Sequence, residues 1–341
     1  MPGPFMVYRT GHKVLMKRIS ACVIVLTFLT AAVCSAAAVT YKDKLGKQIT
    51  VTTPVKRAVF FETYELSAAL DVWNSIAGIS RYAYVNDLML ALKPDIAKSI
   101  PSAGSGSDVN IEMLLRLRPD IVLTWTFKPE TVKFMEEKGL KVIAVYPESL
   151  SELYEVMRFQ GRLFCKEKKV ESVISQMEKI FTLIRERVSK IPVNRRKKAI
   201  WLGGKPTTVS GAIGVNNDIF LLINSINPAS ASVRDRSADV PIERIVAWNP
   251  DVIFIWGSAK YGADDILGNS QWRYVSAVKT GRVFKAPKWS TWSPRLAVIA
   301  LWMAANIYPE DLRDVYLEKT AENFYRSVYG ISYRSVNRIE K

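Results

Sequence analysis

Histidine and cysteine, the side chains that carry most nucleophilic and transition-metal chemistry in proteins, are scarce in this sequence. The 341 residues include one histidine, His12, and three cysteines, Cys22, Cys34 and Cys165. Only Cys165 lies beyond residue 38, and the first 38 residues have the composition of a removable leader. The remaining chain therefore excludes Ser-His-Asp and Cys-His catalysis, as well as zinc, copper or haem sites with a histidine ligand. We expect a binding protein without catalysis or a cofactor of its own, in which Cys165 is a buried apolar side chain outside any disulfide.

Aromatic and arginine side chains near the ends of apolar segments form the second set that could do chemistry. Trp125 and Trp256 each end such a segment, and ligand sites of α/β proteins lie at the carboxyl ends of parallel strands. Aromatic rings offer flat apolar walls, and a guanidinium offers a fork of donors for carboxylate, catecholate or oxyanion oxygens. Core packing is the alternative for the aromatic residues, and solvation at the surface is the alternative for the arginines. The candidate ligand contacts are Arg81, Tyr82, Tyr84, Trp125, Arg234, Arg236, Trp256, Trp289, Trp292 and Arg295.

Residues 1–38 have the pattern of a secretory signal peptide. Four basic residues and no acid occur in residues 1–18, and the uncharged run Ile19–Ala38 follows and ends in small side chains. We predict export with cleavage after Ala38, from a start at Met1 or at Met16. A retained membrane anchor is the alternative, because an uncharged run of 20 residues is long enough to span a bilayer.

The chain is basic both with and without this leader. Lys and Arg number 48 against 32 Asp and Glu, a formal net charge of +16. Removal of the leader leaves 44 basic residues and a net charge of +12. For an exported protein this charge favours an anionic membrane surface or an anionic solute as partner, and not a nucleic acid.

An ungapped internal repeat indicates two similar halves. Asn110–Trp125 recurs as Pro241–Trp256 at a constant offset of 131, with Ile, Glu, Pro, Asp and Trp in the same places. Each copy predicts a short helix with the Glu in its first turn, a break at Pro-Asp, and a buried apolar strand. The strands predicted after the break are Ile121–Leu123 and Val252–Ile255.

Both halves are predicted to be α/β units with mostly parallel sheets, which makes two Rossmann-like lobes. Between them, Lys166–Lys190 has an apolar face at helical spacing, and at about 1.5 Å per residue this helix spans roughly 37 Å. A helical connection of this length is stiff, so we expect limited closure of the lobes. The predicted boundaries are 39–164 for the N-terminal lobe, 165–192 for the connecting helix and 193–341 for the C-terminal lobe.

The sequence resembles the single-helix-hinged (class III) periplasmic binding proteins of ABC importers, which take up ferric siderophores, vitamin B12, haem and some oxyanions. The resemblance runs from about Tyr41 to about Pro309. Besides the two repeat units, it rests on the opening Asp43–Val51, the segment Lys279–Val283 and the Ser293-Pro294-Arg295 sequence. It implies a monomer in the periplasm, with a ligand cleft between its lobes, that delivers its ligand to a membrane permease and its ATPase.

The resemblance also implies roles for particular residues. Tyr82 and Trp125 match positions that contact ligand, and Glu112 and Glu243 match glutamates that pair with arginines on the permease. The repeat supports docking independently, because acids at the same place in each half suit a two-fold partner. The alternative is that both glutamates only stabilise helix N-termini through the helix dipole.

A ferric siderophore is the expected ligand, because an ion that is already chelated needs no histidine or cysteine from the protein. The phenolates of Tyr82 or Tyr84 would then complete its coordination. A corrinoid, a tyrosine-ligated haem, and molybdate or tungstate are the alternatives within the same class of protein. An exported metal-chelating enzyme of similar two-lobed build is the alternative from another class.

Overall fold

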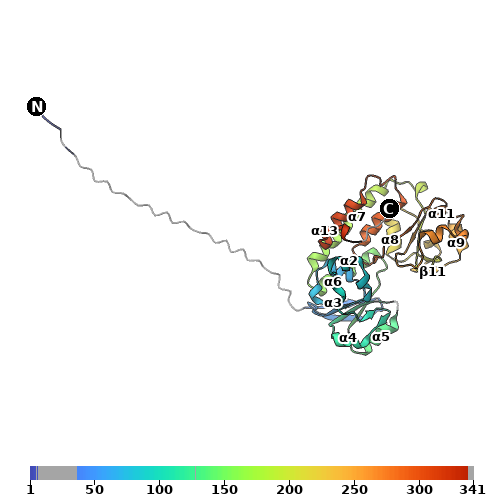
Figure 1. The fold of residues 1–341 in the computed structure, drawn as a ribbon, viewed down its shortest axis with the longest axis horizontal. Coiled ribbons are helices and arrows are strands. Elements are labelled where there is room, and N and C mark those ends of the chain that lie inside the picture. The colour runs from blue at the N-terminus through green and yellow to red at the C-terminus, as the bar shows by residue number, and fades with distance from the viewer. Residues whose placement is uncertain (5, 7–36, 127, 337–341) are drawn as a thin grey trace. The chain divides into compact units, whose positions relative to one another are not determined.

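Two β-sheets with parallel cores form the frame of the protein, one before and one after a long helix in the chain (Figure 1). The structure, a computed structural model, describes residues 1–4, 6, 37–126 and 128–336. The first sheet has the order β4-β3-β7-β8 and is parallel throughout. The second has the order β11-β10-β9-β12-β13 and is parallel over β9, β12 and β13. The predicted α/β fold with mostly parallel sheets is therefore confirmed.

The strands are short and buried, as continuous apolar runs predict for parallel sheets. In the first sheet they are β3 (Ala58–Phe60), β4 (Ile76–Ile79), β7 (Ile121–Trp125) and β8 (Val142–Val145). In the second they are β9 (Ala199–Leu202), β10 (Thr208–Ser210), β11 (Ser237–Asp239), β12 (Val252–Ile255) and β13 (Val283–Lys285). We call the first sheet with its helices the N-terminal lobe and the second with its helices the C-terminal lobe.

One hydrophobic core runs from the first sheet to the second. Alternate strand residues face opposite sides of a sheet, so Phe60 packs in this shared core while Val59 packs in a separate core under the N-terminal lobe. In the second sheet, Phe254 likewise faces the shared core and Ile253 faces a separate core. The lobes are therefore joined by packing as well as by the chain. Residues from 37 onward belong to one compact unit, and the predicted domain boundaries stay a prediction.

The connecting helix is α7 (Glu167–Val188), close to the predicted Lys166–Lys190. Its predicted apolar face is buried in the shared core, where Met177 and Phe181 are fully enclosed. Helices α6 (Leu150–Leu163), α12 (Leu296–Ile307) and α13 (Leu317–Tyr329) pack against it. Helix α12 is apolar on nearly all sides and buried, as its composition predicts. Across the ranges that the structure describes, no helix is long and apolar enough to cross a membrane.

The internal repeat is reproduced in three dimensions. Helices α4 (Ile111–Leu117) and α9 (Ile242–Trp248) have bounds that differ by the offset of 131 at both ends. The aspartate that follows each helix connects its repeat to the neighbouring strand in the same sheet, which is β3 in the first sheet and β9 in the second. Asp120 Oδ2 accepts hydrogen bonds of 2.8 and 2.9 Å from the two backbone N–H groups before β3. Asp251 Oδ2 accepts one of 2.8 Å from the N–H group before β9, so the Pro-Asp break is a structural clamp in both lobes.

The N-terminal predictions are tested only in part. Most of the predicted leader, residues 7–36, lies outside the described residues. Strand β1 (Ala37–Lys42) pairs with β2 (Gln48–Thr53), so predicted cleavage after Ala38 falls within β1. Cys165, expected to be a buried side chain outside any disulfide, is disulfide-bonded and only half-buried, which corrects that prediction.

Candidate functional site

The carboxyl ends of the parallel strands define one edge on each sheet, and ligand sites of α/β proteins occur at such edges. In the N-terminal lobe, Glu62 follows β3, Tyr82 follows β4, Trp125 ends β7 and Tyr146 follows β8. In the C-terminal lobe, residues 203–207 follow β9, Trp256 follows β12, and residues 286–295 follow β13. Chemically versatile side chains are therefore concentrated at these two edges.

The two edges meet at Tyr146. The ring of Trp292 lies edge-on to the ring of Tyr146, with the centroids 4.6 Å apart. The guanidinium carbon of Arg236, from the loop before β11, lies 3.7 Å from the same centroid, which is cation–π geometry. Arg236 Nε also donates a 2.7 Å hydrogen bond to Glu148 Oε1, and Lys44 Nζ lies 3.1 Å from Glu148 Oε2. We call Lys44, Tyr146, Glu148, Arg236 and Trp292 the inter-lobe latch.

The electrostatics of the latch keep its ion pair charged. Burial opposes ionisation of Glu148, but hydrogen bonds from Arg236 and Lys44 outweigh it and lower the pKa of this carboxyl below its ordinary value. Burial raises the pKa of the Tyr146 phenol, and the nearby Arg236 only partly offsets this effect. The side chains of Arg236 and Glu148 are 38% and 28% exposed, so an incoming solute can reach both of them.

Glu62, for which we made no prediction from the sequence, lies at the same edge in an apolar setting. Its relative exposure is 8%, and burial raises the pKa of its carboxyl to about 8, with the nearby carboxylate of Glu65 adding to the rise. Thr63 beside it has a φ of 59°, which is uncommon for a β-branched residue. Gln160 Nε2 donates a 2.9 Å hydrogen bond to Thr63 Oγ1 and supports this turn. At neutral pH Glu62 therefore retains a proton and can donate a hydrogen bond. The signal that could have identified Glu62 in the sequence is its position directly after the apolar run that forms β3.

Two of the predicted aromatic contacts are open to solvent. Tyr82 is 46% exposed on the short helix η2 (Arg81–Val85), and Trp256 is 43% exposed at the end of β12. Arg81 Nη1 lies 2.7 Å from Asp108 Oδ2, and its guanidinium carbon is 5.6 Å from the Tyr82 ring centroid. Both rings are available to a ligand, and Arg81 holds a charge beside the first one.

Two other predicted aromatic residues, Trp125 and Tyr84, make close contacts within the N-terminal lobe. Trp125 is half-buried against Gly106, where an added Cβ would lie 2.8 Å from Trp125 Nε1 and 2.7 Å from Thr124 Oγ1. Glycine is required there for close packing. The hydroxyl of Tyr84 donates a 2.7 Å hydrogen bond to the backbone oxygen of Ile100, which occupies the phenol that was expected to reach a metal.

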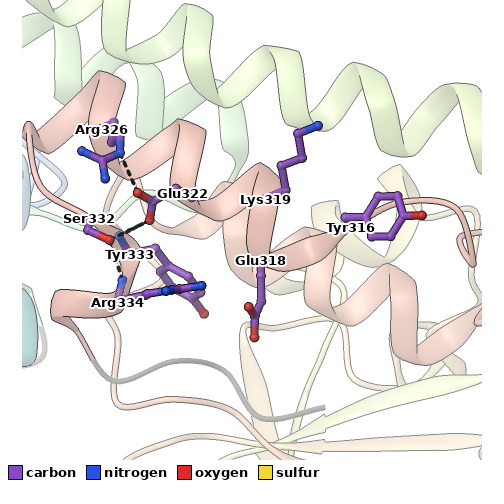
Figure 2. Close-up of a pocket in the computed structure, with 8 residues that line it drawn as sticks. All are labelled: Tyr316, Glu318, Lys319, Glu322, Arg326, Ser332, Tyr333 and Arg334. Atoms are coloured by element: carbon purple, nitrogen blue, oxygen red, sulfur yellow. Dashed lines mark hydrogen bonds and ion pairs between the residues drawn. The ribbon is translucent and has the colours of Figure 1, made fainter.

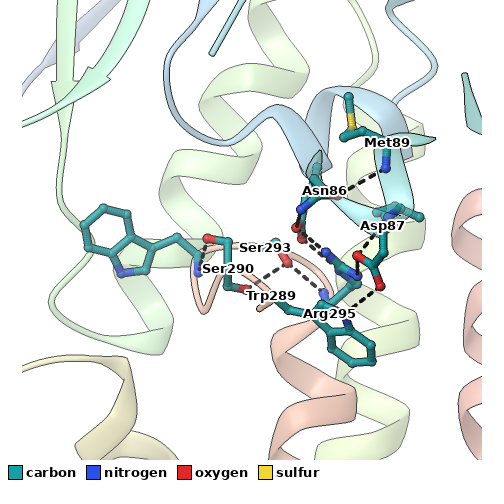
Figure 3. Close-up of polar contacts among 10 residues, drawn as sticks. Asn86, Asp87, Met89, Trp289, Ser290, Ser293 and Arg295 are labelled. Atoms are coloured by element: carbon teal, nitrogen blue, oxygen red, sulfur yellow. Dashed lines mark hydrogen bonds and ion pairs between the residues drawn. The ribbon is translucent and has the colours of Figure 1, made fainter. Parts of the chain in front are cut away.

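Arg295 and Trp289, predicted to contact ligand, lie instead in a buried network with residues of the N-terminal lobe, so their role as ligand contacts stays a prediction (Figure 3). Arg295 is 0% exposed; its Nε donates to Glu65 Oε2 at 3.0 Å, its Nη2 donates to Glu65 Oε1, and its Nη1 donates to Asp87 Oδ1 at 2.7 Å. Trp289 Nε1 donates to Asp87 Oδ2 at 2.9 Å, and the Arg295 guanidinium carbon lies 4.5 Å from the Trp289 ring centroid. The physical reason is charge balance, because buried carboxylates require a cation beside them.

The two predicted docking glutamates lie at the surface. The Glu112 side chain is 83% exposed in the first turn of α4, where its Oε1 lies 3.0 Å from Arg116 Nη2. Glu243 is exposed at the equivalent position of α9. Arg234, predicted to contact ligand, is also exposed, two residues before Arg236 in the same loop.

A surface pocket of about 610 Å³ lies elsewhere, between α13 and residues 332–334 (Figure 2). It is lined mainly by charged and polar side chains, among them Glu322 and Arg326, which form an ion pair. None of the predicted ligand contacts lines it. Within the part of the chain that the structure covers, no group of three or more His, Cys, Asp or Glu residues is arranged to hold a metal ion.

Comparison with known proteins adds a family and a set of relatives. A profile described as periplasmic binding protein matches residues 58–289. The chain is similar to the molybdate-binding protein MolA of Haemophilus influenzae, with 22% identity over 86% of this chain and 92% of MolA. It is also similar to the iron-uptake system-binding protein of Bacillus subtilis, with 25% identity over 79% of this chain and 90% of that protein.

Solved structures show the same architecture. Helicobacter pylori CeuE with bound Ni(II) aligns with a TM-score of 0.78 and 25% identity, over 87% of this chain and 98% of CeuE. MolA bound to molybdate aligns with a TM-score of 0.73 and 22% identity, over 86% of this chain and 99% of MolA. The resemblance in sequence and the likeness in structure therefore extend over most of the chain.

Proposed function

Because the chain belongs to the periplasmic binding protein family, we propose that it is the solute-binding component of an ABC importer. In this role the protein captures a small ligand outside the cytoplasm, without catalysis, and passes it as a monomer to a membrane permease with its ATPase. Export through the predicted leader and a periplasmic location are parts of the same proposal. Similarity to MolA, a periplasmic binding protein cognate to an ABC transporter of Haemophilus influenzae, supports it.

The proposed ligand is an iron chelate of the ferric siderophore kind, bound between the carboxyl edges of the two sheets. Two observations carry this proposal: the exposed rings of Tyr82 and Trp256 follow strands at those edges, and the accessible guanidinium of Arg236 lies on the ring of Tyr146, which follows β8. A chelate presents both apolar faces and anionic oxygens, which suit rings and a guanidinium respectively. Similarity to the iron-uptake system-binding protein of Bacillus subtilis supports the same class.

Molybdate is the second candidate, because MolA is among the relatives and Arg236 offers donors for an oxyanion. A small oxyanion would depend on Arg236 and leave the rings of Tyr82 and Trp256 unused. A neutral corrinoid would show the opposite dependence, and a haem would depend on the rings with Tyr82 as its phenolate. These different dependences make the candidates separable by mutation.

Docking to the permease through Glu112 and Glu243 is part of the proposal. Both side chains are exposed at equivalent positions of α4 and α9, which suits a partner with two equivalent subunits. Each also lies in the first turn of its helix, where a negative charge is favourable. The docking role and the helix-dipole role are therefore compatible.

Ligand-dependent melting tests the proposed function. The purified protein is heated with ferric catecholate, hydroxamate and carboxylate chelates, with cyanocobalamin, with haem and with molybdate. A ligand at about 100 times its Kd stabilises by about 2.7 kcal/mol, which raises the Tm by several degrees. We expect the ferric chelates to give this shift and Trp256→Ala to reduce it. Tyr316→Ala, which removes an exposed ring just before α13 in a segment that follows none of the strands of either sheet directly, is the matched control and should not reduce it.

Two results would contradict the iron-chelate proposal. One is a melting shift with molybdate or cyanocobalamin while every ferric chelate leaves the Tm unchanged. The other is a ferric chelate shift that Trp256→Ala and Tyr316→Ala reduce equally, which would contradict the proposed position of the site and not the ligand class. Native mass spectrometry of the protein purified from its own host gives an independent reading, because a co-purified mass identifies the ligand class.

A further inference from the structure

We propose that Glu148 is an internal competitor for the anionic ligand, which must displace its carboxylate from Arg236 before it can bind. This inference rests on the proposed function, since it concerns the same site. Glu148, in the N-terminal lobe, would then set how tightly Arg236, in the C-terminal lobe, binds an anionic ligand and how strongly it selects for negative charge. The argument depends on three features of the inter-lobe latch.

The first feature is that Glu148 does not form the full two-oxygen hydrogen-bond arrangement with the Arg236 guanidinium. Both donors of the contact, Nε at 2.7 Å and Nη2, meet the same oxygen, Glu148 Oε1. Two parallel hydrogen bonds to two different oxygens make the stronger guanidinium–carboxylate arrangement. A ligand with two anionic oxygens side by side, such as a carboxylate, a catecholate or a tetrahedral oxyanion, can form that arrangement, so it has a geometric advantage over Glu148.

The second feature is that Glu148 also forms an ion pair with a second cation. Its other oxygen, Oε2, lies 3.1 Å from Lys44 Nζ, on the same lobe as Glu148. The loop backbone is held separately, because Gly214 N–H donates to the Glu148 carbonyl at 2.9 Å and Glu148 N–H donates to Glu152 Oε2 at 2.7 Å. When the ligand takes Arg236, Glu148 therefore keeps a charge partner, and the exchange leaves no carboxylate unpaired.

The third feature is that Arg236 stays in place without Glu148. Its guanidinium carbon lies 3.7 Å from the Tyr146 ring centroid, and the Trp292 ring contacts the same ring edge-on at 4.6 Å. The aromatic pair thus presents the guanidinium at the site whether or not the carboxylate is bound. With 38% of the Arg236 side chain exposed, the ligand can approach from solvent.

The first experiment needs no ligand. Phenylglyoxal, which modifies guanidinium groups, is applied to the parent protein, Glu148→Gln and Glu152→Gln, and labelling of Arg236 is followed by peptide mass spectrometry. Glu148→Gln should raise the labelling rate of Arg236 about threefold, the size expected for loss of a partly exposed ion pair. Glu152→Gln removes a carboxylate that pairs with Lys44 and not with Arg236, while its amide oxygen can still accept the hydrogen bond from the Glu148 N–H group, so it should leave the rate unchanged.

The second experiment measures affinity with defined probes: ferric citrate and sodium molybdate as anions, and cyanocobalamin as a ligand without net charge. The parent should bind at least one of the anionic probes. Glu148→Gln should lower the Kd for that anion about threefold to fivefold and leave the Kd for cyanocobalamin unchanged. The gain should disappear in an Arg236→Met background, because the competition exists only while the guanidinium is present.

The outcomes separate this inference from the proposed function. If the parent binds an anionic probe while Glu148→Gln changes neither Arg236 labelling nor affinity, the competitor role is overturned and the binding function stands. Weaker anion binding by Glu148→Gln would also overturn it, since Glu148 would then assist binding. If no probe binds the parent, the proposed function loses its support, and the labelling rates still decide whether Glu148 occupies Arg236.

Discussion

Replacement of Arg295 by Met should destabilise the fold and leave the ligand site unaffected. Arg295 and Glu65 are 0% and 1% exposed, and Asp87 is 9% exposed at its side chain, so the change leaves two carboxylates without their guanidinium in a nearly dry environment. Removal of one partner from a buried ion pair costs about 3–5 kcal/mol. Met has a comparable length and keeps the packing against Trp289, which confines the loss to electrostatics.

Urea unfolding followed by tryptophan fluorescence measures this loss as a free energy of unfolding, and thermal unfolding measures it as a shift of the Tm. At about 2–4 °C for each kcal/mol, the expected loss lowers the Tm by on the order of 10 °C. Arg236→Met is the matched control, because Arg236 is 38% exposed and its ion pair contributes at most about 1 kcal/mol. Combination of Arg295→Met with Glu65→Gln should recover part of the loss, since one unpaired charge is then removed.

One result would refute the reasoning about Arg295. If Arg295→Met unfolds at the same urea concentration as the parent while binding of anionic chelates is lost, then Arg295 contacts the ligand, as its position after β13 first suggested. Equal destabilisation by Arg295→Met and Arg236→Met would likewise show that the buried network has no special energetic weight.

Three further predictions concern other parts of the molecule. The parent protein should lose about 4 kcal/mol of stability as the pH rises from about 5 to 9, and Glu62→Gln should abolish this loss. In the folded parent, the Glu62 carboxyl keeps its proton up to about pH 8, whereas in the unfolded chain it releases the proton near pH 4.5. The stability of the parent therefore falls as the pH rises through this window. Charge reversal of both Glu112 and Glu243 to Arg should lower permease ATPase stimulation at least about tenfold with the Tm nearly unchanged. Gly106→Ala should lower stability by about 1–3 kcal/mol, because its Cβ would clash with Thr124 and Trp125.

Each of these predictions has a decisive opposite outcome. Parallel stability–pH curves for the parent and Glu62→Gln would mean that the carboxyl ionises in the folded protein as it does in the unfolded chain. Full ATPase stimulation by the doubly reversed variant would remove Glu112 and Glu243 from the docking surface. A Gly106→Ala protein with the parent's urea midpoint would show that the loop moves away from Trp125 at no cost.

Local patterns in the sequence were sufficient for the architecture. The repeat predicted two helices and two strands at an offset of 131, and α4 and α9 reproduce that offset at both ends. The apolar face of Lys166–Lys190 predicted α7, and the uniformly apolar segment Leu296–Ile307 predicted a buried helix. These features depend on spacing between neighbours in the chain, so they can be derived without knowledge of distant contacts.

Side-chain roles at the site required the tertiary structure. All three of Trp289, Trp292 and Arg295 lie within ten residues after β13, yet Trp292 is half-buried against Tyr146 while the other two are enclosed. Glu65, the partner of Arg295, is 230 residues away in the chain, and no local spacing identifies such a pair.

By itself, the sequence determined the two α/β halves and the helix between them, because hydrophobic periodicity specifies which face of each element is buried. It also indicated the edge at which we propose the ligand site. Only the tertiary structure decided which of the candidate charged side chains are available to a ligand. It encloses Arg295 with two carboxylates and leaves Arg236 partly exposed beside Glu148. The physical reason is that the burial and charge pairing of a long side chain depend on the surface that folding brings against it, and that surface comes from residues far away in the chain.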